Sequence, residues 1–519
     1  MHWQGELAES LEQHLLEPLT KTDTNRFLSK AGVANQETCD YIYNLTNGLP
    51  FFLDICVDLY ATYKRDHNGA EPDVSIFGKK REDVVERFFR YMDDVTRDMI
   101  KFLCGLGRWT DKLAFEIGTK TFNFSQTTYD RVKTLSSIKS EDFVIDDMRV
   151  ENFSTTIFSF DRTIQNILFP SCNKNVLEKT LEVADEYFSK VLDELDMIGK
   201  YLFNLEYWAK LTMRLTTDPD DLRNRYEKNF ENRLSILINV RCLFDIAENI
   251  LKIFVEEFTD VKGKFKDFQN SVAFAYFEGQ FGKLKNAQGL YQEALAYHKN
   301  SYEKFLNLLG EEKEDTISAM NNLALTLNYL GRNDEALELQ HKAFDLYKKN
   351  LGDDHPYTIT AMNNLALTLG DFGRYDEALE LQQQALDLCK KILGDDHPNT
   401  IMSMNNLALT LRDLGRYDEA LELQQQALDL YKKILGDEHP DTITVMHEFA
   451  VTLRNFGRNE EALKLQQQAL DLYKKILGDE HPDTIRAMDS LSDILSALGR
   501  DDEALALKEK VLDFRKNNA

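Results

Sequence analysis

The chain has 519 residues, 43% apolar and 29% charged, which is enough to fill the cores of two or three folded domains. Its 62 lysines and arginines stand against 88 aspartates and glutamates, a formal net charge of −26. Such an acidic surface repels the phosphates of nucleic acids and anionic lipids, so we expect no nucleic acid and no membrane partner. The six cysteines show no paired spacing, which argues against a disulfide framework or a zinc ribbon.

The first residues lack the basic and apolar segments of a signal peptide. No apolar run reaches the length of a membrane span, because the longest one, residues 234–254, is interrupted by Arg241, Asp245 and Glu248. We therefore expect a cytoplasmic protein.

Residues 6–63 have a helical pattern, with Thr20 or Asp23 as candidate N-caps. The tripeptide Gly48-Leu49-Pro50 is expected to end one helix and begin another. This segment resembles the helical lid of signal-transduction ATPases with numerous domains (STAND proteins), the class that contains NB-ARC proteins. In that class a Gly-Leu-Pro motif lies beside the bound nucleotide. The resemblance implies a lid-like domain over residues 1–72.

Residues 84–109 and 160–168 resemble the winged-helix module that follows such a lid, which implies a winged-helix-like domain over residues 73–172. The stretch 143–147 resembles the acidic strand of those ATPases, but we interpret it as a strand of a winged-helix hairpin. The phosphate-binding loop Gly-x-x-x-x-Gly-Lys-Ser/Thr does not occur in the sequence, so no cofactor is expected. The chain is then either a degenerate relative or a fragment of a nucleotide-switched STAND ATPase.

Residues 173–270 are expected to form a helical linker domain. Apolar residues between Leu177 and Leu202 follow alternating steps of four and three, which fits a short coiled coil or an amphipathic helix in a globular domain. The second interpretation is favoured, because Gly199 and the aromatic cluster after it interrupt a clean heptad pattern.

From residue 271 to residue 519 the sequence is repetitive. A Gly-Arg-x-Asp/Glu-Glu-Ala-Leu motif recurs every 42 residues, beginning at Gly331, Gly373, Gly415, Gly457 and Gly499. Each unit reads as two helices: a first with a core stripe such as Met320, Leu323, Ala324 and Leu327, and a second that starts near Asp334, Asp376 or Asp418. A unit of this kind cannot bury its own apolar face, so the copies are expected to stack into a solenoid.

The units resemble tetratricopeptide repeats of the kinesin-light-chain variety, through the pattern LGDDHPxT, MNNLALTL and GRYDEALELQQQALDLYKKIL. An earlier, degenerate copy places Gly289 and Ala294 one period before Gly331 and Ala336, which makes about six repeats. The predicted fold class is therefore mostly all-α, with an α-solenoid of tetratricopeptide helix pairs preceded by a helical and winged-helix-like region.

One face of each first helix lies opposite the core stripe and carries Asn322, Leu325 and Tyr329 in the first clear repeat. In tetratricopeptide proteins this face lines a concave groove where asparagines hold an extended peptide, because an amide offers both a donor and an acceptor. The alternative, weighed evenly, is that the asparagine pair packs helices together. The resulting candidate groove residues are Asn321, Asn322, Leu325, Asn363, Asn364, Leu367, Asn405, Asn406 and Leu409.

No catalytic residues and no metal ligands are expected. His355, His397, His439 and His481 recur once per repeat in separate connectors, so they do not converge on one metal ion. No nucleophile stands in an activating context, and we predict that the chain is not an enzyme.

The most favoured function is a non-enzymatic scaffold or adaptor that binds a partner protein or an extended peptide in the groove. The groove lacks a lysine clamp, so a neutral or mildly basic partner segment fits best. The chain could be the sensor half of a STAND-like regulator. The alternatives are a kinesin-light-chain-type cargo adaptor and a fragment of a nucleotide-switched STAND ATPase. The oligomeric state stays open.

Overall fold

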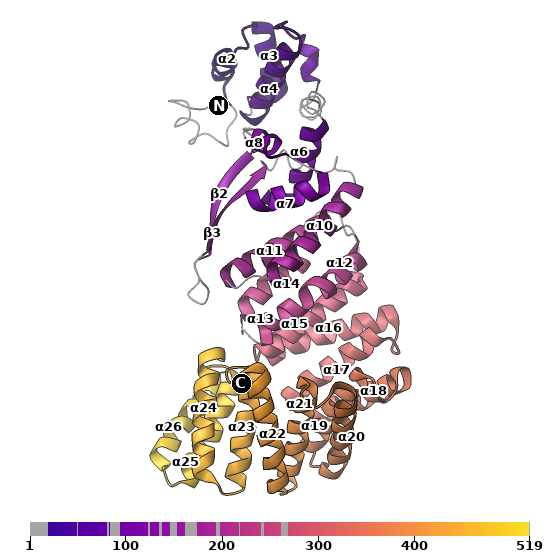
Figure 1. The fold of residues 1–519 in the computed structure, drawn as a ribbon, viewed down its shortest axis with the longest axis vertical. Helices are drawn as coiled ribbons and strands as arrows, with labels where there is room; N and C mark the ends of the chain where they lie inside the picture. The colour runs from indigo at the N-terminus through magenta and orange to yellow at the C-terminus, as the bar shows by residue number, and fades with distance from the viewer. Residues whose placement is uncertain are drawn as a thin grey trace. The chain divides into compact units, whose positions relative to one another are not determined.

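The protein is described by a computed structural model over residues 19–48, 50–79, 83, 94–122, 125–133, 138–145, 153–160, 174–193, 198–216, 218–239, 243–260 and 268–517 (Figure 1). It divides into two compact units, residues 1–216 and 217–519. Both are built mainly of helices, which confirms the predicted mostly α-helical fold class. Parts of several predicted segments lie outside the described residues: 6–18 and 49, 84–93, 146–147 and 161–168.

The first unit contains nine helices, one of them a 3-10 helix, and three strands in its described part. They are α2 (Lys21–Lys30), α3 (Gln36–Thr46), α4 (Pro50–Asp66), the 3-10 helix η1 (Val74–Phe77), α6 (Asp94–Leu106), β1 (Arg108–Trp109), α7 (Asp111–Phe122), α8 (Gln126–Lys133), β2 (Ile138–Ile145), β3 (Phe153–Phe160), α10 (Lys174–Asp193) and α11 (Ile198–Leu215).

The lid-like segment begins and turns where its sequence predicts. Thr20 is the N-cap of α2, and its side chain accepts a hydrogen bond from the backbone N–H of Asp23. Helix α3 ends at Asn47, which is left-handed, and Gly48 follows with φ +70° before α4 starts at Pro50. A Cβ at Gly48 would lie 2.1 Å from the carbonyl oxygen of Leu19. This position therefore requires glycine, because the chain's own backbone occupies the adjacent space.

The strands form one antiparallel sheet in the order β1-β3-β2. Strands β2 and β3 pair from Ile138 opposite Phe160 to Ile145 opposite Phe153, so the prediction of a hairpin strand at 143–145 is confirmed. At the end of β1, the buried Trp109 indole donates to the hydroxyl of Tyr129, which in turn donates to Asp111. The name winged helix stays a prediction for this region.

The apolar stripe between Leu177 and Leu202 divides between two helices, α10 and α11, which pack against each other. The rings of Phe188 and Trp208 stack with centroids 5.7 Å apart, and the Trp208 indole donates to Asp185 over 2.8 Å. This packing supports the globular interpretation rather than the coiled coil.

The second unit begins with helices that precede the repeats and continues as six helix pairs. The preceding helices are α12 (Pro219–Tyr226), the π-helix η3 (Glu227–Glu231), α13 (Asn232–Asn239), α14 (Phe244–Asp260) and the 3-10 helix η4 (Phe268–Asn270). The pairs are α15 (Val272–Ala287) with α16 (Tyr291–Leu309), α17 (Glu314–Tyr329) with α18 (Asn333–Leu351), α19 (Pro356–Asp371) with α20 (Tyr375–Leu393), α21 (Pro398–Asp413) with α22 (Tyr417–Leu435), α23 (Pro440–Asn455) with α24 (Asn459–Leu477), and α25 (Pro482–Ala497) with α26 (Asp501–Asn517). We call these pairs repeats 1 to 6.

Each first helix ends as predicted. The glycine at Gly331 and at its four later equivalents has a positive φ, between +70° and +86°, which terminates the helix in the left-handed region. The prediction for Asp334, Asp376 and Asp418 needs refinement, since they lie in the first turn rather than at the cap. The cap residue is an arginine such as Arg332, which makes no capping hydrogen bond and instead pairs through two nitrogens with Glu335, at 2.7 Å each.

The connectors start the next first helix through histidine and proline. Pro356, Pro398, Pro440 and Pro482 are the first helical residues. The preceding histidine is the N-cap, and its Nδ1 accepts from the backbone N–H two residues later, at 3.2 Å in His397. The four recurring histidines therefore have a structural role, as helix caps.

The core of the repeats is the predicted stripe. Met320, Leu323, Ala324 and Leu327 are buried, as are their equivalents in the later repeats. Helices α12, α13 and α14 pack on α15, where an aromatic cluster including Tyr226, Phe254 and Phe277 fills the junction. The repeat array is thus continuous with the helices before it. The predicted division at residues 1–72, 73–172, 173–270 and 271–519 stays a prediction.

In the part of the chain that the structure describes, no helix is long and apolar enough to cross a membrane.

Candidate partner-binding face

The candidate groove residues lie on the first helices of repeats 2, 3 and 4. We call this surface the asparagine face, made of Ser318, Asn322, Leu325 and Tyr329 in α17 and of the equivalent positions 42 residues apart. Leu325, Leu367 and Leu409 are half-buried, whereas Tyr329 is 53% exposed. The face therefore presents apolar side chains at intervals between polar ones.

The first asparagine of each pair is used largely in packing. Asn363 is 3% exposed and donates through Nδ2 to the hydroxyl of Ser403 in the next repeat, over 3.0 Å. Asn405 is 6% exposed. Asn321 is half-buried and accepts through Oδ1 from Asn364 in the next repeat, over 3.3 Å. These contacts join consecutive repeats.

The second asparagine of each pair is more accessible in two of the three repeats. Asn322 and Asn364 are half-buried, while Asn406 is 8% exposed. Among these three residues, Asn322 and Asn364 are therefore better placed than Asn406 to reach a partner.

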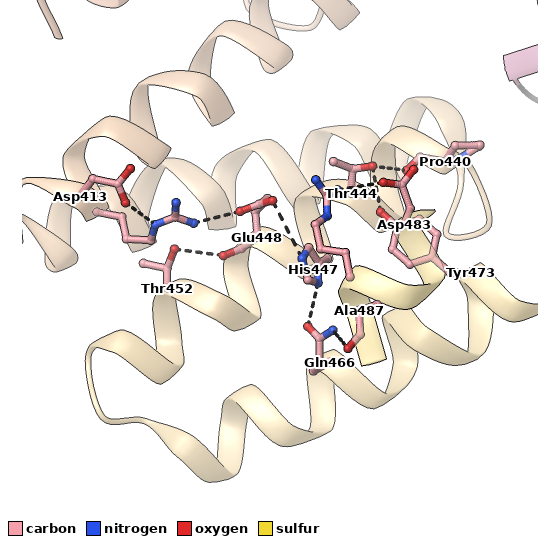
Figure 2. A network of polar contacts seen from close by, with 12 residues as sticks. Asp413, Pro440, Thr444, His447, Glu448, Thr452, Gln466, Tyr473, Asp483 and Ala487 are labelled. Atoms are coloured by element: carbon pink, nitrogen blue, oxygen red, sulfur yellow. Dashed lines mark hydrogen bonds and ion pairs between the residues drawn. The ribbon is translucent and has the colours of Figure 1, made fainter. Parts of the chain in front are cut away.

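In repeats 4 to 6 the asparagine face gives way to a charged network (Figure 2). Arg412 donates to Asp413 and to Glu448, at 2.9 Å each. Buried His447 lies beside Glu448, and its Nδ1 is 3.1 Å from the Oε1 of Gln466. Gln466 in turn donates to the carbonyl of Ala487, so the network joins three repeats.

Electrostatics within this network keep its groups in defined protonation states. Burial alone would raise the pKa of Glu448, but the permanently charged Arg486 and Arg412 help to lower it below its usual value. Burial lowers the pKa of His447. A buried carboxylate next to a neutral imidazole is therefore the favoured arrangement.

The three arginines near the face all have acidic partners. Besides Arg412, Arg454 contacts Asp493 at 2.7 Å and Arg486 contacts Asp483 at 3.2 Å. Their charge is already compensated, so an anionic partner segment gains little from them.

A different environment surrounds the C-terminal ends of α17, α19 and α21. Burial raises the pKa of Asp371, a hydrogen bond from Asn328 acts against it, and the nearby Asp413 raises it further. Tyr329, at the equivalent position one repeat earlier, stacks on Tyr291 with centroids 5.0 Å apart. Neighbouring carboxylates and an exposed aromatic ring favour a positively charged side chain.

The sequence analysis did not predict the ion pairs that these arginines form between repeats. The signal was an arginine in the last turn of one first helix and an acid 36 or 39 residues later, as in Arg412 with Glu448 and Arg454 with Asp493. Among the described residues, no group of three or more His, Cys, Asp or Glu side chains could hold a metal ion.

The family model of the tetratricopeptide repeat matches residues 274–339, 315–391, 363–433, 402–475 and 441–517. No curated protein matches this sequence significantly. Nearly identical repeats of a kinesin light chain from Podospora anserina are 29% identical, covering 39% of this chain and 95% of that one, with a TM-score of 0.33. A STAND protein with a tetratricopeptide repeat sensor from Pyrococcus horikoshii is 14% identical, covering 96% and 74%, with a TM-score of 0.38.

A Rap protein complexed with competence and sporulation factor is 12% identical and covers 66% of this chain and 93% of that one, with a TM-score of 0.42. Because these TM-scores are low, the assignment rests on the family model and on the stacked helix pairs. The second unit is an α-helical repeat solenoid. Residues 274–517 are tetratricopeptide repeats, a module that serves as a protein-interaction scaffold.

Proposed function

We propose that the chain is a non-enzymatic adaptor whose asparagine face binds an extended, neutral to mildly basic segment of a partner protein. The observation that carries this proposal is the half-buried Asn322 and Asn364, set one repeat apart between half-buried leucines. Neighbouring packed helices lie about 8–10 Å apart and an extended chain rises about 3.3 Å per residue, so the two amides can pair with peptide groups about three residues apart. The carboxylate of Asp371 at the edge of the face favours a lysine or arginine in that segment, whereas Asp413 is already paired with Arg412.

The test uses partners captured from lysate with the full chain, followed by affinity measurement with the purified partner. The variant Asn322→Ala with Asn364→Ala should lower the melting temperature only slightly, because the half-buried Asn364 loses its bond to Asn321. It should weaken binding roughly thirtyfold, since each hydrogen bond lost to the partner is worth about 1 kcal/mol. Asn363→Ala is the matched control, because this neighbouring amide packs against Ser403. It should lower the melting temperature and leave affinity nearly unchanged. Equal affinity of the double variant and the wild type would move the site off this face.

We further infer that the chain is the sensor half of a STAND-like regulator. The order α6, β1, α7, α8, β2, β3 with the sheet order β1-β3-β2 favours this, since it is the arrangement that a winged helix requires. At Gly48 the backbone of Leu19 fills the space beside the Gly-Leu-Pro motif, and the N–H of Leu19 donates to the carbonyl of Gly48 over 2.7 Å.

The purified chain should accordingly show no stoichiometric binding of ATP or ADP at micromolar concentration by calorimetry. Binding at that level would instead favour a nucleotide-switched ATPase. A pull-down with a kinesin motor subunit separates the adaptor of microtubule transport, which requires that interaction, from the sensor, which does not.

A further inference from the structure

The first and last repeats of the array touch each other. The Nε2–H of His481, at the start of α25, donates to the carbonyl oxygen of Ala287 over 3.0 Å, across 194 residues of sequence. Next to it, the ring of Pro482 lies against Gly289, where a Cβ would come within 2.4 Å of the proline Cδ. We call the pairing of Ala287 and Gly289 with His481 and Pro482 the closing contact.

His481 differs from the other histidine caps in using both ring nitrogens. Its Nδ1 accepts from the N–H of Asp483 over 3.2 Å, as in the three other caps, while Nε2 donates to repeat 1. A single neutral tautomer satisfies both bonds, and the side chain is 9% exposed. His439, at the same position one repeat earlier, caps its helix in the same way and serves as a natural comparison.

Near the closing contact, equivalent faces of the first helices of repeats 2 and 6 point toward the inside of the array. Arg486 occupies in repeat 6 the position that Ser318 occupies in repeat 2, so Arg486 lies on the same side of its first helix as Tyr329 does on the asparagine face. Although the Tyr329 side chain is 53% exposed, the protein around it raises the pKa of its hydroxyl, Asp483 raises this pKa further and Arg486 lowers it. Charges influence a phenol this way only over short distances, so the faces of repeats 2 and 6 look toward each other.

We propose that the closing contact holds the six repeats as a ring with the asparagine face inside, and that it opens to admit the partner segment. The ring itself follows from the contacts within the second unit; only the route of the partner rests on the proposed function. The contact consists of one hydrogen bond and one proline ring, so opening requires little free energy compared with unfolding a repeat. A folded domain is excluded while the ring is closed, whereas an extended segment enters when it opens.

Hydrogen exchange of the full chain tests the ring without any partner. His481→Asn keeps a side-chain oxygen for the cap and removes the bond to Ala287. It should raise exchange about fivefold in residues 285–292, at the opposite end of the array. His439→Asn makes the same replacement at a cap with no such contact and should leave residues 285–292 unchanged.

The reciprocal experiment places the change in repeat 1. Gly289→Ala meets Pro482 and should raise exchange in residues 481–486, whereas Gly331→Ala, with nearly the same positive φ and open space around it, should not. Unchanged exchange at the far end in both His481→Asn and Gly289→Ala would overturn the ring. Because no partner is present, that result would leave the test of Asn322 and Asn364 unaffected.

Discussion

At the scale of single residues, four buried glutamines at equivalent positions of the repeats differ in their hydrogen bonding. Gln340, Gln382, Gln424 and Gln466 occupy the same place in four second helices, and all are fully buried. Gln466 is satisfied by His447 and by the carbonyl of Ala487. In the other three, neither amide atom has a hydrogen-bond partner within the described structure. An unpaired buried amide is destabilising, so the four equivalent glutamines contribute differently to the free energy of unfolding although their sequence repeats.

The replacement Gln382→Met should therefore stabilise the protein by about 1 kcal/mol, because it removes an unpaired amide and preserves the volume. Gln466→Met should destabilise it by roughly 1–3 kcal/mol, since it leaves the Ala487 carbonyl and His447 without their partner. Thermal unfolding of both variants beside the wild type gives the comparison. Shifts of the same sign in the two variants would contradict the assigned difference.

His298 gives the protein an acid sensitivity. It is 1% exposed against Gly282, and burial, assisted by Lys283, lowers the pKa of its imidazole to about 3, from about 6.5 when unfolded. Between these values the unfolded chain binds a proton that the folded chain does not. Stability from this residue is therefore complete above about pH 6.5 and falls by about 1.4 kcal/mol per pH unit below it.

Melting temperatures at pH 7 and pH 5 measure this effect. In His298→Gln the decrease between the two values should be smaller than in the wild type, whatever the absolute stability of the variant. His341→Gln, which changes an exposed histidine of the next repeat, should keep the wild-type decrease. An identical decrease in all three proteins would show that His298 is not the group responsible.

At the scale of helices, the sequence predicts where helices begin and end when adjacent residues determine these positions. Glycine after a first helix and proline at the start of the next specify their conformation locally, and the structure places both residue types at those helix ends. The N-cap residues are harder to predict, because histidine is outside the usual set of N-cap residues and Asp334 lies near the helix start without being the cap. Of the candidate groove, the sequence predicts the face but not the burial of Asn363, Asn405 and Asn406, which depends on neighbouring repeats.

Contacts distant in sequence escape such reasoning, and Arg223 is an example. Its guanidinium donates two hydrogen bonds to Asp315, at 2.8 and 2.6 Å, and thereby connects α12 with α17. Burial alone would lower the pKa of Arg223, but the hydrogen bonds that it donates to Asp315 and Glu227 raise it overall. The residues are 92 positions apart, and no periodic pattern relates them.

Arg223→Lys should weaken this junction by about 1–2 kcal/mol, since an ammonium group cannot reproduce the paired bonds of a guanidinium. Hydrogen exchange should then increase in α12 and in the first turn of α17. Arg225→Lys is the control, because the contact of Arg225 with Asp221 stays within α12. Equal protection of α12 in the wild type and the Arg223 variant would mean that apolar packing alone holds the junction.

At the scale of the whole repeat array, a constant period predicts a solenoid but not its closure. The rotation from one repeat to the next is small, and only its sum over six repeats brings His481 to Ala287. No local residue type signals this, since His481 stands in the same motif as three histidines that lack the contact. Repeats 2 to 4 carry the asparagine face and repeats 4 to 6 the charged network, so copies of one sequence motif present different surfaces.

Deleting one 42-residue period tests the stacking of the repeats separately from the contact between the first and last repeats. Deletion of residues 397–438 joins Asp396 to His439 and restores the connector before Pro440, so the remaining helices keep their neighbours. We expect a soluble protein with helical circular dichroism per residue close to the wild type. The five remaining repeats rotate through a smaller angle, so exchange in residues 285–292 should rise as it does in His481→Asn.

Deletion of residues 397–417 removes α21 and leaves α22 without its paired helix, which exposes the apolar side chains that Leu407 and Leu411 cover. This protein should lose cooperative thermal unfolding and aggregate, because an unpaired helix cannot bury its apolar face. Equal loss of cooperativity in the two deletions would contradict stacking of independent helix pairs. Full protection of residues 285–292 after deletion of 397–438 would instead contradict closure by accumulated rotation, because five repeats would then reach as far around as six.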